Sequence, residues 1–430
     1  MKDIHVLLLS YSNSTTLNQA LTSLRSVHHR VEDITILEEP NLSLQINDPA
    51  ITERIKCIKL IQNDLGITLN KYIQELSCEY VLFLYGEEYF DTKIKHIVLE
   101  LHDNEYVMTY PWIVKGKVIQ RPFFVKTSFL KQTNFFSKYQ IPFKEAVLPS
   151  WLSKISKSFI VNTSGDFINK TSMNISADNL QKLNFIEKYR YILEQGFNQP
   201  SISVILSNYN MADYVGVAIN SCFLQTTPPE KILVIDDGST DNSYKKLEKW
   251  SQFSQFKLFQ KENGGKARAL NELLPHIETE FVIELDADDW FDPDAFSIIR
   301  RYLEVLPNDV AVLYGNSRHW RQTNSEDIKY RMIKKGKSVN NKHELLSYIF
   351  PLAPRIYRTS SLKKNNGFPI IEFEDGRMYE DVSVLNDLLK KNRLLYQDFT
   401  VYNVREHKSS ITKKNKKSYS YWSNFKKNLD

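Results

Sequence analysis

Short apolar runs alternate with amphipathic stretches along most of the chain. In the second half the pattern predicts strands over 202–206, 231–235 and 281–283, and it predicts a helix over 266–277. Buried strands that alternate with helices are typical of an α/β protein, in which helices pack on the faces of a sheet. We therefore expect an α/β fold from about residue 200 onward.

The first half of the chain repeats this layout. Four segments match in the same order: 5–13 with 203–210, 32–40 with 230–238, 66–91 with 266–292, and 124–131 with 356–363. One match could arise by chance, but four in register indicate a tandem duplication. The expected divisions are a first copy at 1–176, a linker helix at 177–197, a second copy at 198–412 and a tail at 413–430.

The two copies differ where polar chemistry would occur. Tyr85 stands in the first copy where Asp286 stands in the second, and Ala146 aligns with Asp381. A tyrosine cannot supply a carboxylate. We therefore expect the first copy to be degenerate and non-catalytic, serving as a scaffold, a docking surface or a sugar-binding module.

Composition adds few constraints. The chain has 430 residues, of which 42% are hydrophobic and 25% charged, as in a globular protein of two or three domains. No apolar run approaches the roughly 18 residues of a membrane span, and the N-terminus lacks a signal-peptide core, which predicts a cytoplasmic protein. Three widely spaced cysteines fit neither a disulfide framework nor a zinc site, so we expect them to be buried and inert.

The net charge of +5 is small, and much of the excess lies in the tail. Lysines there surround Tyr419, Tyr421 and Trp422. This tail is either a solvated end or a basic and aromatic patch that touches an anionic membrane surface or a polyanionic acceptor. No nucleic-acid-binding motif accompanies it, so we expect no nucleic-acid partner.

An acidic loop, LDADDWFDPDAF, follows the predicted strand at 281–283. Asp286, Asp288 and Asp289 are hard oxygen ligands suited to Mg or Mn, which would keep coordination positions open for a substrate's phosphate oxygens. The loop therefore points to a nucleotide-diphosphate substrate. Taken alone, the same acids could be a solvated loop or helix N-caps.

Several motifs occur together in the second half, and in this order: SVILSNYN, VIDDGSTDNS, NGGKARALN, ELDADDWFDPDAF, YEDVSVLNDLL and EHKSSIT. In this combination the chain resembles the family 2 glycosyltransferases. The resemblance covers most of 200–412 and, weakly, 1–165. It implies the GT-A fold, a Rossmann-type α/β nucleotide-sugar-binding sheet with an acidic DxD loop at its edge, here duplicated.

The resemblance also implies a role for particular residues. Asp286 would contact the ribose, Asp288 and His407 would bind a Mn or Mg cation, and Asp381, beside Glu380, would be the general base. The nucleotide-binding set would be Ser207, Tyr209, Asn210, Asp236, Asp237, Arg268 and Asp286. The implied reaction is an inverting transfer from a nucleotide-diphosphate sugar to a hydroxyl of a carbohydrate or glycoconjugate acceptor.

Each assignment has a structural alternative. Asp236 and Asp237 could form an Asx-turn, Arg268 could be solvated, His407 could be structural, and Glu380-Asp381 could cap a helix. Asp289 could be a further metal ligand or a loop acceptor.

Among functions, the alternative to an enzyme is a non-catalytic sugar- or nucleotide-binding module of a surface-polysaccharide or spore-coat apparatus. A nucleotidyltransferase lacks its glycine-rich signature here. A P-loop is excluded because Ala267 follows Gly264-Gly265-Lys266. Residues 316–350, present only in the second copy, are expected to include acceptor-side loops.

Overall fold

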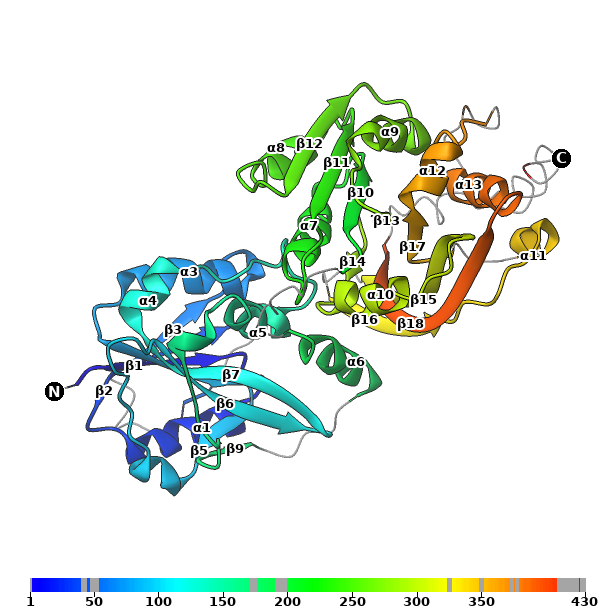
Figure 1. Ribbon diagram of the computed structural model, residues 1–430. Helices are drawn as coiled ribbons and strands as arrows, with labels where there is room; N and C mark the ends of the chain where they lie inside the picture. Colours follow the sequence, from blue (N-terminus) through cyan, green and yellow to red (C-terminus); the bar gives the residue numbers. More distant parts are fainter. Residues whose placement is uncertain are drawn as a thin grey trace. The chain divides into compact units, whose positions relative to one another are not determined.

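A computed structural model describes residues 2–39, 45–46, 54–170, 176–189, 199–322, 327–347, 352–371, 375, 379–407 and 425. The chain divides into two compact units, Met1–Tyr191 and Ile192–Asp430, each with its own sheet (Figure 1). Apart from Phe425, the basic tail expected at 413–430 lies outside the described residues, as does 190–197 of the expected linker helix.

The C-terminal unit is built on a nine-stranded sheet in the order β12-β11-β10-β13-β17-β15-β18-β14, with β16 paired to β15. The strands are β10 (Ile202–Asn208), β11 (Lys231–Asp237), β12 (Phe256–Lys261), β13 (Phe281–Glu284), β14 (Trp290–Phe291), β15 (Val310–Gln322), β16 (Ile328–Lys334), β17 (Arg355–Arg358) and β18 (Arg393–Glu406). β12, β11, β10 and β13 run parallel, and β17 is antiparallel to β13. The carboxyl ends of the parallel strands therefore meet at one edge, where ligands bind in open α/β sheets.

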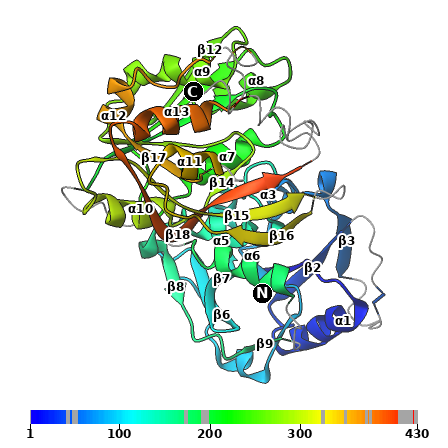
Figure 2. The same cartoon turned by 90° about the vertical axis from the view of Figure 1, so that its right-hand side faces the viewer.

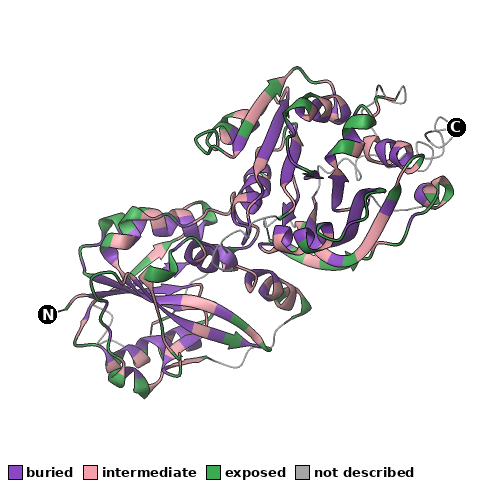
Figure 3. Cartoon of the chain, in the orientation of Figure 1, coloured by how far each residue is buried: buried purple, intermediate pink, exposed green. Residues whose placement is uncertain are grey.

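Helices cover both faces of this sheet, which is why β10 and β13 are buried almost throughout (Figure 3). The helices are α7 (Val215–Phe223), α8 (Ser243–Glu248), α9 (Lys266–Leu273), α10 (Ala295–Leu303), α11 (Lys342–Ser347), α12 (Thr359–Lys364) and α13 (Glu380–Leu389). One apolar core joins α7 and α10 to the sheet, and a second joins α9, α12 and α13, which lie in one group (Figure 2). The α/β fold expected for this half is confirmed.

The N-terminal unit has a seven-stranded sheet in the order β3-β2-β1-β4-β7-β6-β8, and β5 pairs with β9. Its strands are β1 (Ile4–Leu9), β2 (Val31–Glu38), β3 (Ile55–Lys59), β4 (Tyr80–Tyr85), β5 (Glu88–Phe90), β6 (Val107–Val114), β7 (Lys117–Lys126), β8 (Ile160–Asn162) and β9 (Ile168–Lys170). Its helices are α1 (Ser14–Ser23), α3 (Leu65–Glu75), α4 (Thr127–Gln132), α5 (Val147–Leu152) and α6 (Ala177–Ile186).

The two sheets share one strand order, since β3-β2-β1-β4-β7-β6-β8 corresponds position by position to β12-β11-β10-β13-β17-β15-β18. Register agrees as well. Leu82 pairs with Phe124 in the first sheet, and Ile283 pairs with Ile356 in the second. One residue further along each ladder, Phe83 and Phe123 take the places of Glu284 and Arg355.

An asparagine clasp is repeated in both units. In one, Asn271 donates its amide N–H to the carbonyl of Phe368 and accepts the N–H of Phe368, both at 2.8 Å. In the other, Asn70 makes the same two bonds with Phe135, both at 2.8 Å. When the two clasps are taken as equivalent, α3 corresponds to α9. Leu65 then corresponds to Lys266.

Two details differ from expectation. Cys57 is exposed, because it lies on the edge strand β3, whereas Cys78 and Cys222 are buried as expected. The helix expected over 266–277 is α-helical only to Leu273, and the 3-10 turn Leu274–His276, which contains Pro275, follows it. No helix among the described residues has the length and apolarity to cross a membrane.

Candidate active site

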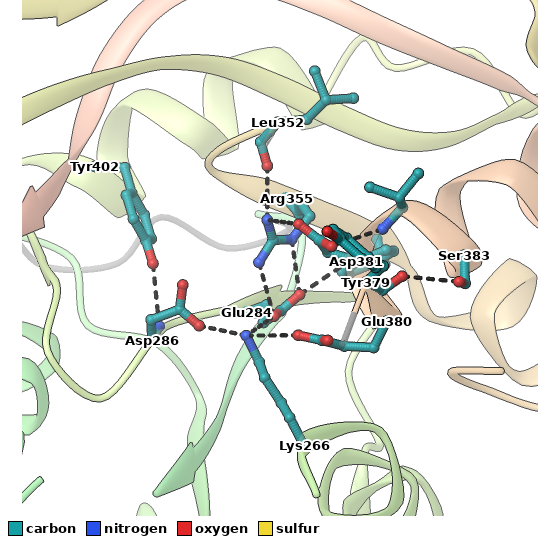
Figure 4. A network of polar contacts seen from close by, with 12 residues as sticks. Lys266, Glu284, Asp286, Leu352, Arg355, Tyr379, Glu380, Asp381, Ser383 and Tyr402 are labelled. Carbon is teal, nitrogen blue, oxygen red and sulfur yellow. Dashed lines mark hydrogen bonds and ion pairs between the residues drawn. The ribbon is translucent and has the colours of Figure 1, made fainter. Parts of the chain in front are cut away.

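A network of acidic and basic side chains lies at the carboxyl end of β13 (Figure 4). Its centre is Lys266, the first residue of α9. The ammonium of Lys266 contacts the carboxylate of Asp286, and it lies 2.7 Å from Glu284 and 3.5 Å from Glu380. Lys266 therefore joins the acidic loop to the first residue of α13.

Arg355, on β17, forms the second half of this network. Its guanidinium donates two hydrogen bonds to the Glu284 carboxylate, at 2.8 and 2.9 Å, and lies 3.6 Å from Asp381. A parallel two-bond contact of this kind holds both groups in one geometry. Asp286 is thus brought to the same place as Glu380 and Asp381, which lie about 95 residues further along the chain.

Burial and charge act against each other in this network. Burial alone would lower the pKa of Lys266, but Asp286, Glu284 and Glu380 together raise it well above its usual value. Burial likewise disfavours the charge on Glu284, yet Arg355 and Lys266 hold the pKa of Glu284 well below its usual range. Both groups are therefore charged across the physiological pH range.

Glu380 behaves differently from its neighbours. Burial, outweighing the opposing charge of Lys266 and aided by Asp381 and Glu284, raises the pKa of Glu380 to about 7. The N-cap of α13 is Tyr379, at φ 60°, so neither Glu380 nor Asp381 caps this helix. Asp381 instead accepts the N–H of Val382 at 2.9 Å.

Asp288 and His407 form a second group next to the network. Nε2 of His407 lies 2.9 Å from the Asp288 carboxylate, and the His407 ring packs on Tyr214 with ring centres 4.3 Å apart. Both residue types bind Mn or Mg, and their donor atoms already converge. Among the described residues no cluster of three ligand side chains forms.

Asp289 is buried beside this pair. It accepts the backbone N–H of Arg405 at 2.8 Å, and the Arg405 side chain donates to the carbonyl of Asp288 at 2.9 Å. Burial first, then the charges of Asp288 and Asp286, raise the pKa of Asp289 well above its usual value. Of the two roles left open for Asp289, these contacts are those of a loop acceptor.

Asp236 and Asp237 end β11, and protein donors occupy both carboxylates. Asp236 is wholly buried and accepts from the Asn208 amide at 2.8 Å and the Ser239 N–H at 3.0 Å. Asp237 accepts the N–H groups of Gly264 and Gly265 at 2.9 and 2.8 Å. They therefore organise the loops at this edge, and contact with a nucleoside stays a prediction.

Gly238 follows these acids with φ at +71°, and a Cβ on it would lie 2.6 Å from the backbone nitrogen of Asn263. Only glycine allows this turn and this close approach of the two loops.

Ser207, Tyr209 and Asn210 lie at and just after the end of β10. Tyr209 is 46% exposed, which leaves its ring open to a planar ligand. Asn210 accepts the N–H of Thr240 at 2.8 Å and so ties the two loops together. Their nucleotide contacts remain predictions.

Arg268 contacts residues outside the network. It donates to the carbonyl of Gly264 at 2.9 Å and to the side chain of Asp375 at 2.9 Å. The cation nearest the acidic loop is therefore Lys266, two residues earlier on α9.

Sequence reasoning missed Lys266, Glu284 and Arg355. Lys266 and Glu284 stand inside the quoted motifs NGGKARALN and ELDADDWFDPDAF, beside residues that were singled out. A charged residue at the end of an otherwise apolar strand was a usable signal for Glu284. Arg355 had no local signal, because its partner lies on another strand.

Residues 203–365 match the family model described as glycosyl transferase family 2. An uncharacterised glycosyltransferase of Nostoc is 32% identical over 182 residues, which cover 36% of this chain and 55% of that protein. An uncharacterised glycosyltransferase of Rickettsia felis is 34% identical over 116 residues, covering 27% and 19%. The glycosyltransferase GlyA of Streptococcus pneumoniae is 26% identical over 227 residues, covering 49% and 31%. The chain thus spans between 19% and 55% of the length of these relatives.

Some solved structures also have a limited likeness to this chain. TarS 1-349 of S. aureus in complex with UDP is 26% identical with a TM-score of 0.38, and the match covers 48% of this chain and 60% of that one. A mannosyltransferase of Pyrobaculum calidifontis, in complex with GDP-Man and Mn2+, is 16% identical with a TM-score of 0.36, covering 54% and 64%. On the family match and the sequence relatives, the domain at residues 203–365 belongs to glycosyltransferase family 2.

Proposed function

We propose that the C-terminal unit transfers a sugar, with inversion, from a nucleotide-diphosphate sugar to an acceptor hydroxyl. The observation that carries this proposal is the single ammonium of Lys266, which contacts Asp286 of the acidic loop and lies 3.5 Å from Glu380. On this proposal Asp286 binds the donor and Glu380 lies on the acceptor side, and both acids lie around the Lys266 ammonium. Family membership of residues 203–365 supports the same reaction class.

Asp381 is the proposed general base. As the acceptor oxygen bonds to the anomeric carbon, the bond from that carbon to the diphosphate breaks on the opposite side, and Asp381 takes the hydroxyl proton. One displacement of this kind inverts the anomeric centre. Arg355, 3.6 Å from Asp381, holds the carboxylate in place.

Donor binding is assigned to the edge formed by the β10, β11 and β13 loops. Tyr209 offers an exposed ring for the base, and Asp286 would accept a hydrogen bond from the ribose. Asp288 and His407 would hold a Mn or Mg cation, which when bound offsets the negative charge on the departing diphosphate. Lys266 orients Asp286 and adds a positive charge to this edge.

The N-terminal unit is, on this proposal, a degenerate copy. The shared strand order supports a common origin, and Leu65, Phe83 and Phe123 in place of Lys266, Glu284 and Arg355 support a loss of the charged network. A carbohydrate or glycoconjugate acceptor, and a place in surface-polysaccharide or spore-coat glycan synthesis, are proposed from the resemblance alone.

A donor screen tests the function. The full chain is incubated with UDP-, GDP- and dTDP-sugars, with Mn, with Mg or with EDTA, and released nucleoside diphosphate is measured. We expect release from one donor class, and its loss with EDTA. Folded protein that is silent with every donor would overturn the proposal in favour of the non-catalytic binding module.

A further inference from the structure

The N-terminal unit contains a pocket of about 140 Å³. The turn 85–88 after β4 forms one wall, the β6–β7 hairpin forms another, and α6 lies across them. By the shared strand order, this turn occupies the place of the acidic loop 286–289. A pocket therefore remains at the position where the other unit has its charged network.

A buried acid fixes the floor of this pocket. Glu88 is 2% exposed, and its carboxylate accepts the hydroxyl of Tyr110, a guanidinium N–H of Arg121 and, at 3.1 Å, the N–H of Tyr85. The Tyr11 hydroxyl donates to the Glu88 carbonyl at 2.6 Å. With these partners Glu88 is a structural acid that holds Arg121 in place.

Arg121 presents a rigid donor edge to the pocket. Its guanidinium lies 3.6 Å from the ring centre of Trp112 and 4.9 Å from that of Tyr85, and Nη1 is the nitrogen that pairs with Glu88. The side chain keeps 12% exposure and lines the pocket. A planar guanidinium stacked on aromatic rings offers its remaining N–H groups in one plane.

The charges around the pocket balance. Three acids and three bases line it: Glu87, Glu88, Glu145, Arg121, Lys170 and Lys182. Apolar groups fill much of the remaining wall, among them Ile119, Pro149, Leu183 and Ile186. A wall without net charge does not select an ion, but it offers acceptors and donors together with an apolar surface.

We propose that this pocket binds one neutral sugar residue of a glycan. Each sugar hydroxyl is both a donor and an acceptor, so it can bond to carboxylates and to arginine or lysine at once, while the C–H groups of the ring pack on the apolar wall. The volume is well below the roughly 300–1,000 Å³ of pockets for drug-sized ligands, so it suits a single ring and not a nucleotide sugar. This site concerns the other unit and stands apart from the proposed transfer reaction.

Ligand-observed NMR on the full chain tests this site. The neutral probes are methyl glucoside, methyl galactoside, methyl mannoside and N-acetylglucosamine. Glucuronate, glucose 1-phosphate and inorganic phosphate are tested beside them as anionic ligands. We expect saturation transfer to at least one neutral sugar. We expect binding to weaken at least about tenfold in Arg121→Lys, which keeps the charge but loses the fork, and in Lys170→Met.

Matched variants separate this pocket from other sites. Lys93→Met removes an exposed lysine of the same unit that does not line the pocket, and it should leave binding unchanged. Asp288→Asn alters the other unit and should also leave binding unchanged. Lys170→Met keeps the test valid if Arg121→Lys disturbs the fold. Binding of anions alone, binding unaffected by both pocket variants, or no binding of any probe would each overturn the inference.

Discussion

Glu284 and Arg355 face each other across β13 and β17 with two hydrogen bonds of 2.8 and 2.9 Å, and both are almost fully buried. The N-terminal unit has Phe83 and Phe123 at the same two positions of the same ladder. The fold therefore accepts either a buried ion pair or two aromatic side chains at this point. Only the ion pair can anchor Lys266 and Asp381.

Changing one partner of this pair should be more harmful than changing both. Arg355→Phe leaves the Glu284 charge without its guanidinium, which we expect to lower the free energy of unfolding by about 3–5 kcal/mol. Glu284→Phe combined with Arg355→Phe should lower it by less than Arg355→Phe alone. Urea unfolding of the full chain measures both, and strictly additive losses would contradict the expectation.

Replacing Lys266 with methionine should abolish most turnover while the fold remains. The change removes the ammonium that holds Asp286 and Glu380, and loss of one preorganised charge costs on the order of 100-fold in kcat. Lys249→Met, at an exposed lysine on the same unit, is the matched control and should keep full activity. Equal rates for Lys266→Met and wild type would remove Lys266 from the site.

Asp288→Asn should lower the apparent affinity for Mn or Mg and reduce release of nucleoside diphosphate at a fixed metal concentration. The amide keeps the size of the carboxylate but not its charge beside His407. Metal titration of the rate measures the shift. Asp213→Asn, at a side chain with 78% exposure, is the control, and an identical metal dependence in all three proteins would argue against Asp288 as a ligand.

The pKa of Glu380 predicts a pH-dependent contribution to stability. Burial first, with Asp381 and Glu284, raises this pKa from 4.5 to about 7 in the folded chain, so the native state keeps a proton that the unfolded chain has released. The free energy of unfolding should therefore fall as pH rises from about 4.5 through about 7. Glu380→Gln has no group that titrates at this position. The free energy of unfolding of the wild type minus that of the variant should therefore fall between about pH 4.5 and about pH 7. A difference that is flat with pH would contradict the raised pKa.

Asp237→Ala should reduce stability whether or not nucleotide is present. The change leaves the N–H groups of Gly264 and Gly265 without their acceptor, at a cost of about 1–3 kcal/mol. Urea unfolding checks this value in the absence of ligand. A variant with wild-type stability and only a raised KM for donor would assign Asp237 to the nucleoside alone.

Periodicity predicted the α/β architecture, because strands and helices follow from runs of neighbouring residues. The roles of single residues in the acidic loop and of Glu380-Asp381 were implied only by the family resemblance. The pairing of Arg355 with Glu284 depends on an antiparallel register between strands distant in sequence, which no local pattern encodes. The resemblance assigned Arg268 to the nucleotide and gave no role to Lys266, two residues earlier. Because α9 begins at Lys266, the side chain of Lys266, and not that of Arg268, contacts Asp286 and Glu284.

The asparagine clasp has a consequence for protein engineering. Asn70 and Asn271 make the same pair of bonds in two units that differ in the sheet ladder, where Phe83 and Phe123 of one unit stand in place of Glu284 and Arg355 of the other. A backbone that accommodates both kinds of side chain is suited to the transfer of residues from one unit to the other. Exchanging Leu65, Phe83, Tyr85, Phe123 and Ala146 for their charged counterparts is thus a short route to installing a second reactive centre in one polypeptide.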